Sequence, residues 1–203
     1  MAKILVTGGC GYIGTHTIVD LIENGFDVVS IDNLSRSDIR ALQAVEKLTG
    51  KAIKNYQVDL CNFDDTYAVF QEHTDINGII HFAAYKAVGE SCEKPLMYYE
   101  NNLNSLVNLL KCADEFGIPH IVFSSSCTVY GNPDSTPVTE DFPIKQAESP
   151  YGATKQMGEV IVRDFTKSTA ASAILLRYFN PVGAHPSAAI GELPIGRPMN
   201  LVP

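Results

Sequence analysis

Residues 1–32 read MAKILVTGGCGYIGTHTIVDLIENGFDVVSID, and this stretch decides the fold. The apolar run Lys3–Thr7 predicts a strand, which ends in a cluster of glycines. A helical pattern of apolar residues continues to Gly25, and a second predicted strand, Val28–Ile31, ends on Asp32. A strand, a glycine-rich turn, a helix and a second strand form the unit that binds a dinucleotide in many α/β proteins.

The glycines of the first turn fit two spacings. Gly9, Gly11 and Gly14 match the common dinucleotide fingerprint, whereas Gly8, Gly11 and Gly14 match the wider spacing of short-chain dehydrogenases. Glycine allows such a turn to adopt positive φ and to approach a pyrophosphate closely. The N–H groups at the start of the following helix then stabilise the phosphate charge.

Acidic residues end two of the predicted strands. Asp32 is placed to accept hydrogen bonds from the adenosine ribose and to repel a 2′-phosphate, which favours NAD over NADP. Arg36 follows closely and leaves this preference open, and a solvated strand-end acid is the alternative role for Asp32. Asp59 ends the third predicted strand, where it hydrogen-bonds an adenine amino group or caps the next helix.

Length, charge and cysteine content exclude several classes of protein. The 203 residues suffice for one α/β domain, or for one domain and the start of another, with a core that needs no metal or disulfide. The net charge of −8 argues against a nucleic acid or an anionic membrane as partner. No apolar run approaches the ~20 residues of a membrane span. The five cysteines form no C-x-x-C pair, so we expect a cytoplasmic protein without a metal site.

Strands and helices alternate along the rest of the chain. The further predicted strands are Ile53–Val58, Asn77–Phe82, His120–Phe123 and Ala171–Tyr178. The further predicted helices are Asp38–Thr49, Asn62–Glu72, Pro95–Phe116 and Tyr151–Ser168. This alternation predicts an α/β fold with a doubly wound parallel sheet, whose strands end at one edge where ligands bind. The chain loses its periodicity from Asn180 onward, which indicates a binding loop or an absent neighbour.

Two features of the predicted ligand edge have an open interpretation. Ala83 and Ala84 follow the fourth strand, where small residues allow either a cofactor or a helix to lie against the backbone. Asn101, Asn102 and Asn104 interrupt a long helical pattern. Because asparagine is a poor helix former, we expect at least one of these amides to be tied to a loop or a ligand.

The strongest chemical pattern is Tyr151-Gly-Ala-Thr-Lys155 at the start of a predicted helix. Side chains at i and i+4 share a helix face, so the lysine ammonium lies beside the tyrosine ring. A free phenol has a pKa of about 10, and we expect Lys155 and an oxidised nicotinamide to lower it until Tyr151 acts as a base. An exposed pair without function is the alternative. Ser126, at the end of the fifth strand, is the natural third member. The other candidates for this hydroxyl are Ser124, Ser125 and Thr128.

Five motifs, taken together, carry a resemblance to a known family. They are TGGCGYIG, HFAAYKAVGES, FSSSCTVYG, SPYGATK and LRYFNPVGAHPSAAIGE. In this order they resemble the UDP-glucose 4-epimerase family of extended short-chain dehydrogenases/reductases over essentially the whole chain. The resemblance implies a Rossmann-like fold and the interconversion of UDP-galactose and UDP-glucose, by NAD-dependent oxidation and re-reduction at the sugar C4. It also implies a homodimer formed through the two long helices.

The resemblance implies a role for particular positions. The cofactor would be bound by Gly8, Gly11, Tyr12, Ile13, Gly14, Asp32, Asn33, Asp59, Leu60, Phe82, Ala83, Lys86, Asn101, Tyr151, Lys155 and Phe179. The catalytic residues would be Ser126, Tyr151 and Lys155. The sugar nucleotide would be contacted by Lys86, Ser126, Tyr151, Asn180, Asn200 and Leu201.

The length of the chain departs from the family pattern. Family members continue further, so the resemblance implies an NAD-binding domain over residues 1–179 and the start of a truncated substrate-binding portion over 180–203, of doubtful activity by itself. A nucleotide-sugar 4,6-dehydratase would need an Asp-Glu pair where this chain has Cys127 and Thr128. A UDP-N-acetylhexosamine 4-epimerase and a non-catalytic NAD-binding module remain as alternatives.

Overall fold

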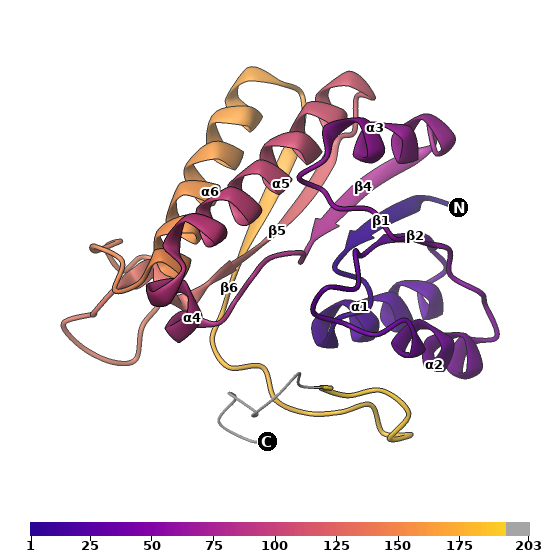
Figure 1. The fold of residues 1–203 in the computed structure, drawn as a ribbon, viewed down its shortest axis with the longest axis horizontal. Coiled ribbons are helices and arrows are strands. Elements are labelled where there is room, and N and C mark those ends of the chain that lie inside the picture. Colours follow the sequence, from indigo (N-terminus) through magenta and orange to yellow (C-terminus); the bar gives the residue numbers. More distant parts are fainter. Residues whose placement is uncertain (194–203) are drawn as a thin grey trace.

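Six parallel strands form one sheet in the computed structural model, which describes residues 1–193. The strands are β1 (Lys3–Thr7), β2 (Asp27–Ile31), β3 (Asn55–Tyr56), β4 (Ile76–His81), β5 (His120–Ser126) and β6 (Ser172–Tyr178). Their order in the sheet is β3-β2-β1-β4-β5-β6 (Figure 1). The chain therefore starts at the centre and builds outward in both directions, which confirms the predicted doubly wound, Rossmann-like fold.

Helices cover both faces of the sheet (Figure 1). They are α1 (Tyr12–Glu23), α2 (Arg40–Thr49), α3 (Phe63–Glu72), α4 (Val88–Glu93), α5 (Pro95–Glu115), α6 (Pro150–Ser168) and the short 3₁₀ helix η1 (Cys127–Tyr130). α1 and α2 pack on one face and α3, α5 and α6 on the other. None of the helices of residues 1–193 is long and apolar enough to cross a membrane.

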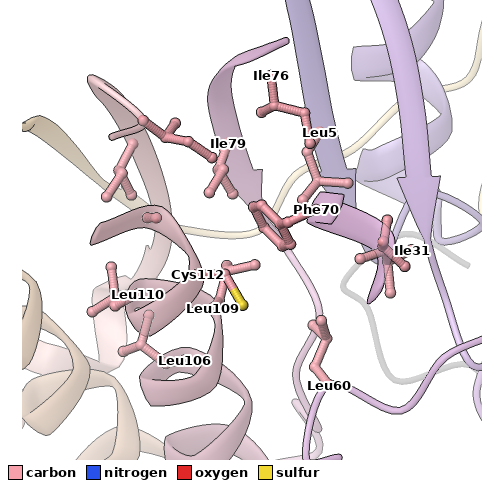
Figure 2. Packing of buried hydrophobic residues seen from close by; sticks show 14 of the residues in the cluster. Leu5, Ile31, Leu60, Phe70, Ile76, Ile79, Leu106, Leu109, Leu110 and Cys112 are labelled. Carbon is pink, nitrogen blue, oxygen red and sulfur yellow. The ribbon is translucent and has the colours of Figure 1, made fainter. Parts of the chain in front are cut away.

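Each face of the sheet has its own apolar core. The larger core joins the sheet to α3, α5 and α6, and Figure 2 shows Phe70 of α3 near its centre, together with Leu5, Ile79 and Leu109. The smaller core joins the opposite face to α1 and α2 and contains Ile18. Because both faces are covered, the central strands are nearly continuous apolar runs, as expected of parallel strands.

Successive strands are added on one side of β1 up to β3 and on its other side from β4 onward, and this switch in strand order places the ligand edge. Thr7, the last residue of β1, pairs with Ile31 of β2 on one side and with His81 of β4 on the other. The segments that follow these three strands therefore leave the sheet side by side. In doubly wound sheets a ligand binds at this switch point, beyond the carboxyl ends of the strands.

Most element boundaries agree with the prediction to within one residue, and four larger differences stand out. The third strand is only Asn55–Tyr56, because it lies at the sheet edge and pairs with β2 alone. The fifth strand continues to Ser126, since β6 pairs with it as far as that residue. The second helix begins at Arg40 rather than Asp38. The fourth difference is helix α4, Val88–Glu93, which the sequence analysis did not predict.

The segment after β6 returns across the carboxyl edge toward α1, and it contains neither helix nor strand over the described residues to 193 (Figure 1). Ile190 is buried in the same apolar cluster as Ile18 and Leu42. The Tyr12 hydroxyl donates a hydrogen bond to the Gly183 carbonyl. The predicted loop therefore lies over the first turn of α1.

Candidate active site

The glycine turn follows β1 and precedes α1. Gly8 has φ +70°, and a Cβ there would lie 2.9 Å from the Ala83 backbone nitrogen. A Cβ on Gly14 would lie 2.2 Å from the Gly8 carbonyl oxygen. Gly11 is the N-cap of α1, and no side chain of residues 1–193 caps this helix. The first N–H groups of α1 therefore face the carboxyl edge without a side-chain acceptor, which suits a pyrophosphate.

Asp32 connects this turn to the loop after β2. Its Oδ2 accepts a hydrogen bond from the Cys10 N–H at 3.0 Å. Its Oδ1 accepts from the Leu34 N–H at 3.0 Å and from the Ser37 hydroxyl at 2.7 Å. Asp32 is only 8% exposed, so it is not a solvated acid at a strand end. A carboxylate has about four acceptor sites, so lone pairs remain for ribose hydroxyls.

The two residues expected near adenine lie at the end of the segment that follows β3. Asp59 is exposed, and its carboxylate accepts from the Cys61 N–H at 2.9 Å. Asp59 is not the helix cap, because Asn62 caps α3 by accepting from the Asp65 N–H. Leu60 is buried in the larger core. Asn33, expected at the ribose, closes a local turn by accepting from Ser35 at 3.0 Å.

The segment after β4 packs against the glycine turn and is held by α5. The Phe82 N–H donates to the Thr7 carbonyl at 3.1 Å, and the Ala83 N–H to the Thr7 hydroxyl at 3.3 Å. The side chain of Asn102 bonds both backbone groups of Tyr85, at 2.8 and 3.0 Å. This confirms the prediction that a helical asparagine is tied to a loop.

Two further candidates, Asn101 and Lys86, are associated with this segment. The Asn101 amide donates to the Asn102 side chain at 2.9 Å, so it stands next to the residue that fixes the loop. Lys86 is exposed, and its ammonium lies 3.5 Å from a carboxylate oxygen of Glu192. Glu192 belongs to the segment that returns from β6, so this ion pair connects the two segments that border the carboxyl edge.

Tyr151 and Lys155 occupy the first turns of α6. Ser149 caps this helix by accepting from the Gly152 N–H at 3.1 Å. Tyr151 is 9% exposed and Lys155 is 4% exposed. The Lys155 ammonium lies 5.8 Å from the centre of the Tyr151 ring and donates to the Ser124 carbonyl at 2.7 Å. The two side chains are therefore neighbours in a dry site, and they are not the exposed pair of the alternative interpretation.

Burial dominates the protonation of both groups. Burial lowers the pKa of Lys155 to about 8. Burial raises the pKa of Tyr151 above its usual value, and a hydrogen bond with Ser126 opposes this change. The pKa of Tyr151 is therefore raised, not lowered as expected from its neighbour Lys155, because burial outweighs the hydrogen bond with Ser126. A base at Tyr151 requires a further positive charge near the ring.

Ser126 is the hydroxyl that meets the phenol. It is the last residue of β5, is 7% exposed, and influences the pKa of Tyr151 through a hydrogen bond. Ser125 is used further along the same helix α6, where its hydroxyl donates to Glu159 at 2.6 Å. Ser124 uses its carbonyl to bind Lys155. The Thr128 hydroxyl is buried and has no hydrogen-bond partner among residues 1–193, so it stays available to a ligand.

The remaining candidates lie beyond β6. Phe179 is 57% exposed, and Asn180 is also exposed at the start of the returning segment. Asn200 and Leu201 lie outside the described residues. The sequence analysis missed one feature of this edge, an ion pair between Arg36 and Glu90 at 2.9 Å. Its only sequence signal is the position of Arg36 close to Asp32.

The fold and this edge define a class of protein: a Rossmann-like domain with a glycine turn and a tyrosine–lysine pair on a helix. The chain belongs to the NAD dependent epimerase/dehydratase family, whose model matches residues 4–193. It is 52% identical over 201 residues to the UDP-glucose 4-epimerase of Bacillus subtilis, covering 98% of this chain and 59% of that protein. It is 50% identical over 202 residues to the UDP-glucose 4-epimerase of Dictyostelium discoideum.

Solved structures give the same result. A UDP-glucose 4-epimerase from Bifidobacterium longum, in complex with NAD⁺ and UDP, superposes with a TM-score of 0.95 at 47% identity. That match covers 98% of this chain and 60% of the other. An enzyme of the same name from Stenotrophomonas maltophila superposes with a TM-score of 0.94 at 44% identity. This chain therefore spans about 60% of the length of its relatives.

Proposed function

We propose that this protein binds NAD and takes part in the interconversion of UDP-galactose and UDP-glucose. The observation that carries the proposal is the meeting of Tyr151, Lys155 and Ser126 at the carboxyl edge that also holds the glycine turn. Relatives at about half identity are named UDP-glucose 4-epimerases, which supports this substrate class.

The residues present fit NAD. The first N–H groups of α1 have no side-chain acceptor among residues 1–193, and Asp32 retains acceptor capacity for the ribose. In the proposal, Tyr12 and Ile13 meet the pyrophosphate, Asn33 the ribose, and the rest of the path is lined by Asp59, Leu60, Phe82, Ala83, Lys86, Asn101 and Phe179. When bound, NAD supplies the hydride acceptor and a positively charged nicotinamide ring.

In the proposal, side chains of this protein transfer the proton of the sugar 4-hydroxyl. Tyr151 accepts the proton of the sugar 4-hydroxyl and later returns it, and Ser126 orients that hydroxyl through its own hydrogen bond. The raised pKa of Tyr151 keeps the phenol protonated until a positive charge lies beside it. Lys155 is positioned to hold a ribose hydroxyl of the cofactor, because its ammonium has no carboxylate partner in residues 1–193.

The proposal divides the chain into an NAD-binding domain, residues 1–179, and the beginning of a substrate-binding portion, residues 180–203. Lys86 and Asn180 flank the edge where the sugar nucleotide would enter, and we assign Asn200 and Leu201 to the same ligand. We further propose a cytoplasmic homodimer. Apolar side chains exposed on α5 and α6, namely Leu96, Met157 and Val160, support an interface on this surface.

One experiment tests the central proposal. The purified protein is denatured, the released nucleotide is identified by chromatography, and a second sample is incubated with UDP-galactose and assayed for UDP-glucose. NAD together with conversion supports both parts of the proposal. NAD without conversion reduces the proposal to a cofactor-binding module, and the absence of NAD contradicts both parts.

A further inference from the structure

The loop after β2 contains both an acid and a base that could select the cofactor. Asp32 disfavours a 2′-phosphate, whereas arginines near this position hold the 2′-phosphate in NADP-dependent domains. Arg36 lies in the same loop, and the next residue, Ser37, donates to the Asp32 carboxylate at 2.7 Å. The backbone of Arg36 is therefore close to the adenosine ribose end of the proposed NAD site.

The guanidinium of Arg36 is already engaged. Its Nη2 donates to both carboxylate oxygens of Glu90, at 2.9 and 3.0 Å. The guanidinium carbon lies 5.0 Å from the centre of the Tyr85 ring, within range of a cation–π contact. Hydrogen bonds between charged groups are stronger than neutral ones, so this arrangement holds the charge of Arg36 and the donors of its Nη2.

Glu90 is a fixed acceptor. Tyr98 is fully buried, and its hydroxyl donates to Glu90 Oε2 at 3.0 Å. The same hydroxyl accepts from the Ala87 N–H at 3.1 Å, at the start of α4. The side chain of Glu90 is 22% exposed, whereas that of Arg36 is 50% exposed. Arg36 is therefore the partner that moves if the pair is broken.

The ion pair also spans the ligand edge. Arg36 follows β2 and Glu90 follows β4, and these strands flank β1 in the sheet. The connection thus runs from one side of the glycine turn to the other, next to the path on which the cofactor would lie. A surface ion pair contributes little to stability by itself, so its position across this path is its more informative property.

We propose that Glu90 determines the preference for NAD over NADP by sequestering Arg36. This inference rests on the proposed NAD-binding function. With its guanidinium bound to Glu90 and stacked on Tyr85, Arg36 does not compensate the repulsion between Asp32 and a 2′-phosphate. Glu90 is thus a positioning residue for cofactor selection that acts through Arg36.

The test measures the affinities of NAD and NADP by calorimetry, after removal of bound nucleotide. Glu90→Gln keeps the side-chain volume and an acceptor for Tyr98 but removes the charge that holds Arg36. The ratio of NADP affinity to NAD affinity is expected to rise about tenfold, the effect of one new hydrogen bond to a charged group. Glu90→Ala is expected to change the ratio in the same direction.

Three further variants make the test specific. Arg36→Ala is expected to leave the ratio unchanged, because Arg36 is sequestered in the wild type. Adding Arg36→Ala to Glu90→Gln is expected to remove the gain. Glu72→Gln is the matched control, because it removes one carboxylate from another exposed ion pair, with Lys54, on the opposite side of β3 from the ligand edge. This control is expected to have no effect on the ratio.

The outcomes separate this inference from the proposed function. If the wild type binds NAD and the ratio is unchanged in both Glu90 variants, the inference is wrong and the function stands. A gain that persists in the double variant, or a ratio that falls in Arg36→Ala, also overturns it. A wild type that binds neither nucleotide contradicts the proposed function, and the inference with it.

Discussion

Two buried charges on α6 lie four residues apart, and their surroundings differ. Glu159 is fully buried and accepts hydrogen bonds from Ser125 at 2.6 Å, Arg163 at 2.7 Å and Arg177 at 2.8 Å. Lys155 is buried as well, but its ammonium donates to a backbone carbonyl, and no carboxylate in the described part of the chain forms an ion pair with it.

The pKa values show the consequence of this difference. Burial alone would raise the pKa of Glu159, yet hydrogen bonds from Arg177 and Ser125 outweigh burial and lower it. No ion pair within residues 1–193 offsets the burial of Lys155, whose pKa falls to about 8. A compensated charge connects α6 to β5 and β6, whereas an uncompensated one is typical of a functional site. The turn of α6 around Glu159 thus serves the fold, and we assign the N-terminal turn with Tyr151 and Lys155 to the proposed ligand.

The largest expected effect concerns the N-terminal turn of α6, which carries Tyr151. Tyr151→Phe removes only the hydroxyl that carries the proton, so conversion of UDP-galactose to UDP-glucose should fall by about 10³-fold or more while NAD binding is unchanged. The measurement is a timed product assay together with nucleotide content. Tyr67→Phe, on α3 against Phe116, is the matched control and should change neither. An equal loss of conversion and of NAD binding in Tyr151→Phe would mean that the tyrosine is structural.

The second prediction concerns the turn of α6 that carries Glu159. Glu159→Gln leaves the guanidinium of Arg177, which is only 14% exposed, without its counter-charge. Removing one partner of a buried ion pair is strongly destabilising, so the free energy of unfolding should fall by about 3 kcal/mol. Denaturant unfolding followed by circular dichroism measures this change. A loss of less than about 1 kcal/mol would show that the cluster does not compensate the buried charge as we describe.

The third prediction is a gain in the free energy of unfolding rather than a loss. Lys155→Met replaces an uncompensated buried ammonium by an apolar side chain of similar length. The lowered pKa of Lys155 represents a cost of about 3 kcal/mol at neutral pH. The variant loses the hydrogen bond to Ser124, so we expect a net gain in unfolding free energy of about 2 kcal/mol, together with weaker NAD binding. A destabilised variant would place Lys155 in the same structural role as Glu159.

The effect of Lys155 on stability should depend on pH. Its pKa is about 8 in the folded protein and 10.5 in the unfolded chain, so the unfolded state binds more protons between these values. The wild type therefore gains stability relative to Lys155→Met as the pH rises through this window. The difference between the two proteins should be largest below pH 8 and should decrease toward pH 10.5. A constant difference would mean that the lysine is not the titrating group.

The sequence predicted the fold because the central strands share one recognisable sequence pattern. β1 and β4 are apolar runs with small residues shortly after them, and their order follows from the alternation of strands and helices. The prediction was wrong where local pattern is weak. β3 is an edge strand of two residues, which is shorter than any periodicity can define. Helix α4 is only six residues long and follows an alanine-rich segment.

The sequence also predicted the part of the site that a local pattern encodes. The tyrosine–lysine pair is a local i, i+4 pattern, so the sequence places both side chains on one face of α6. The burial that sets their pKa values comes from packing against β5 and α5, which no local pattern encodes. The same holds for the pair of Arg36 with Glu90, since 54 residues separate them along the chain. Only the topology of the sheet brings them together.

The smallest expected effect distinguishes the two arginines that bind Glu159. Arg163 and Arg177 both bind Glu159, but the side chain of Arg163 is 43% exposed and that of Arg177 is 14% exposed. Because solvent screens the half-exposed guanidinium of Arg163, Arg163→Ala should lower the free energy of unfolding by about 0.5 kcal/mol. Arg177→Ala should cost several times more, because it leaves Glu159 buried with one half-exposed partner. Equal losses in the two variants would show that the cluster acts as a unit, and that exposure does not decide which arginine compensates the buried carboxylate.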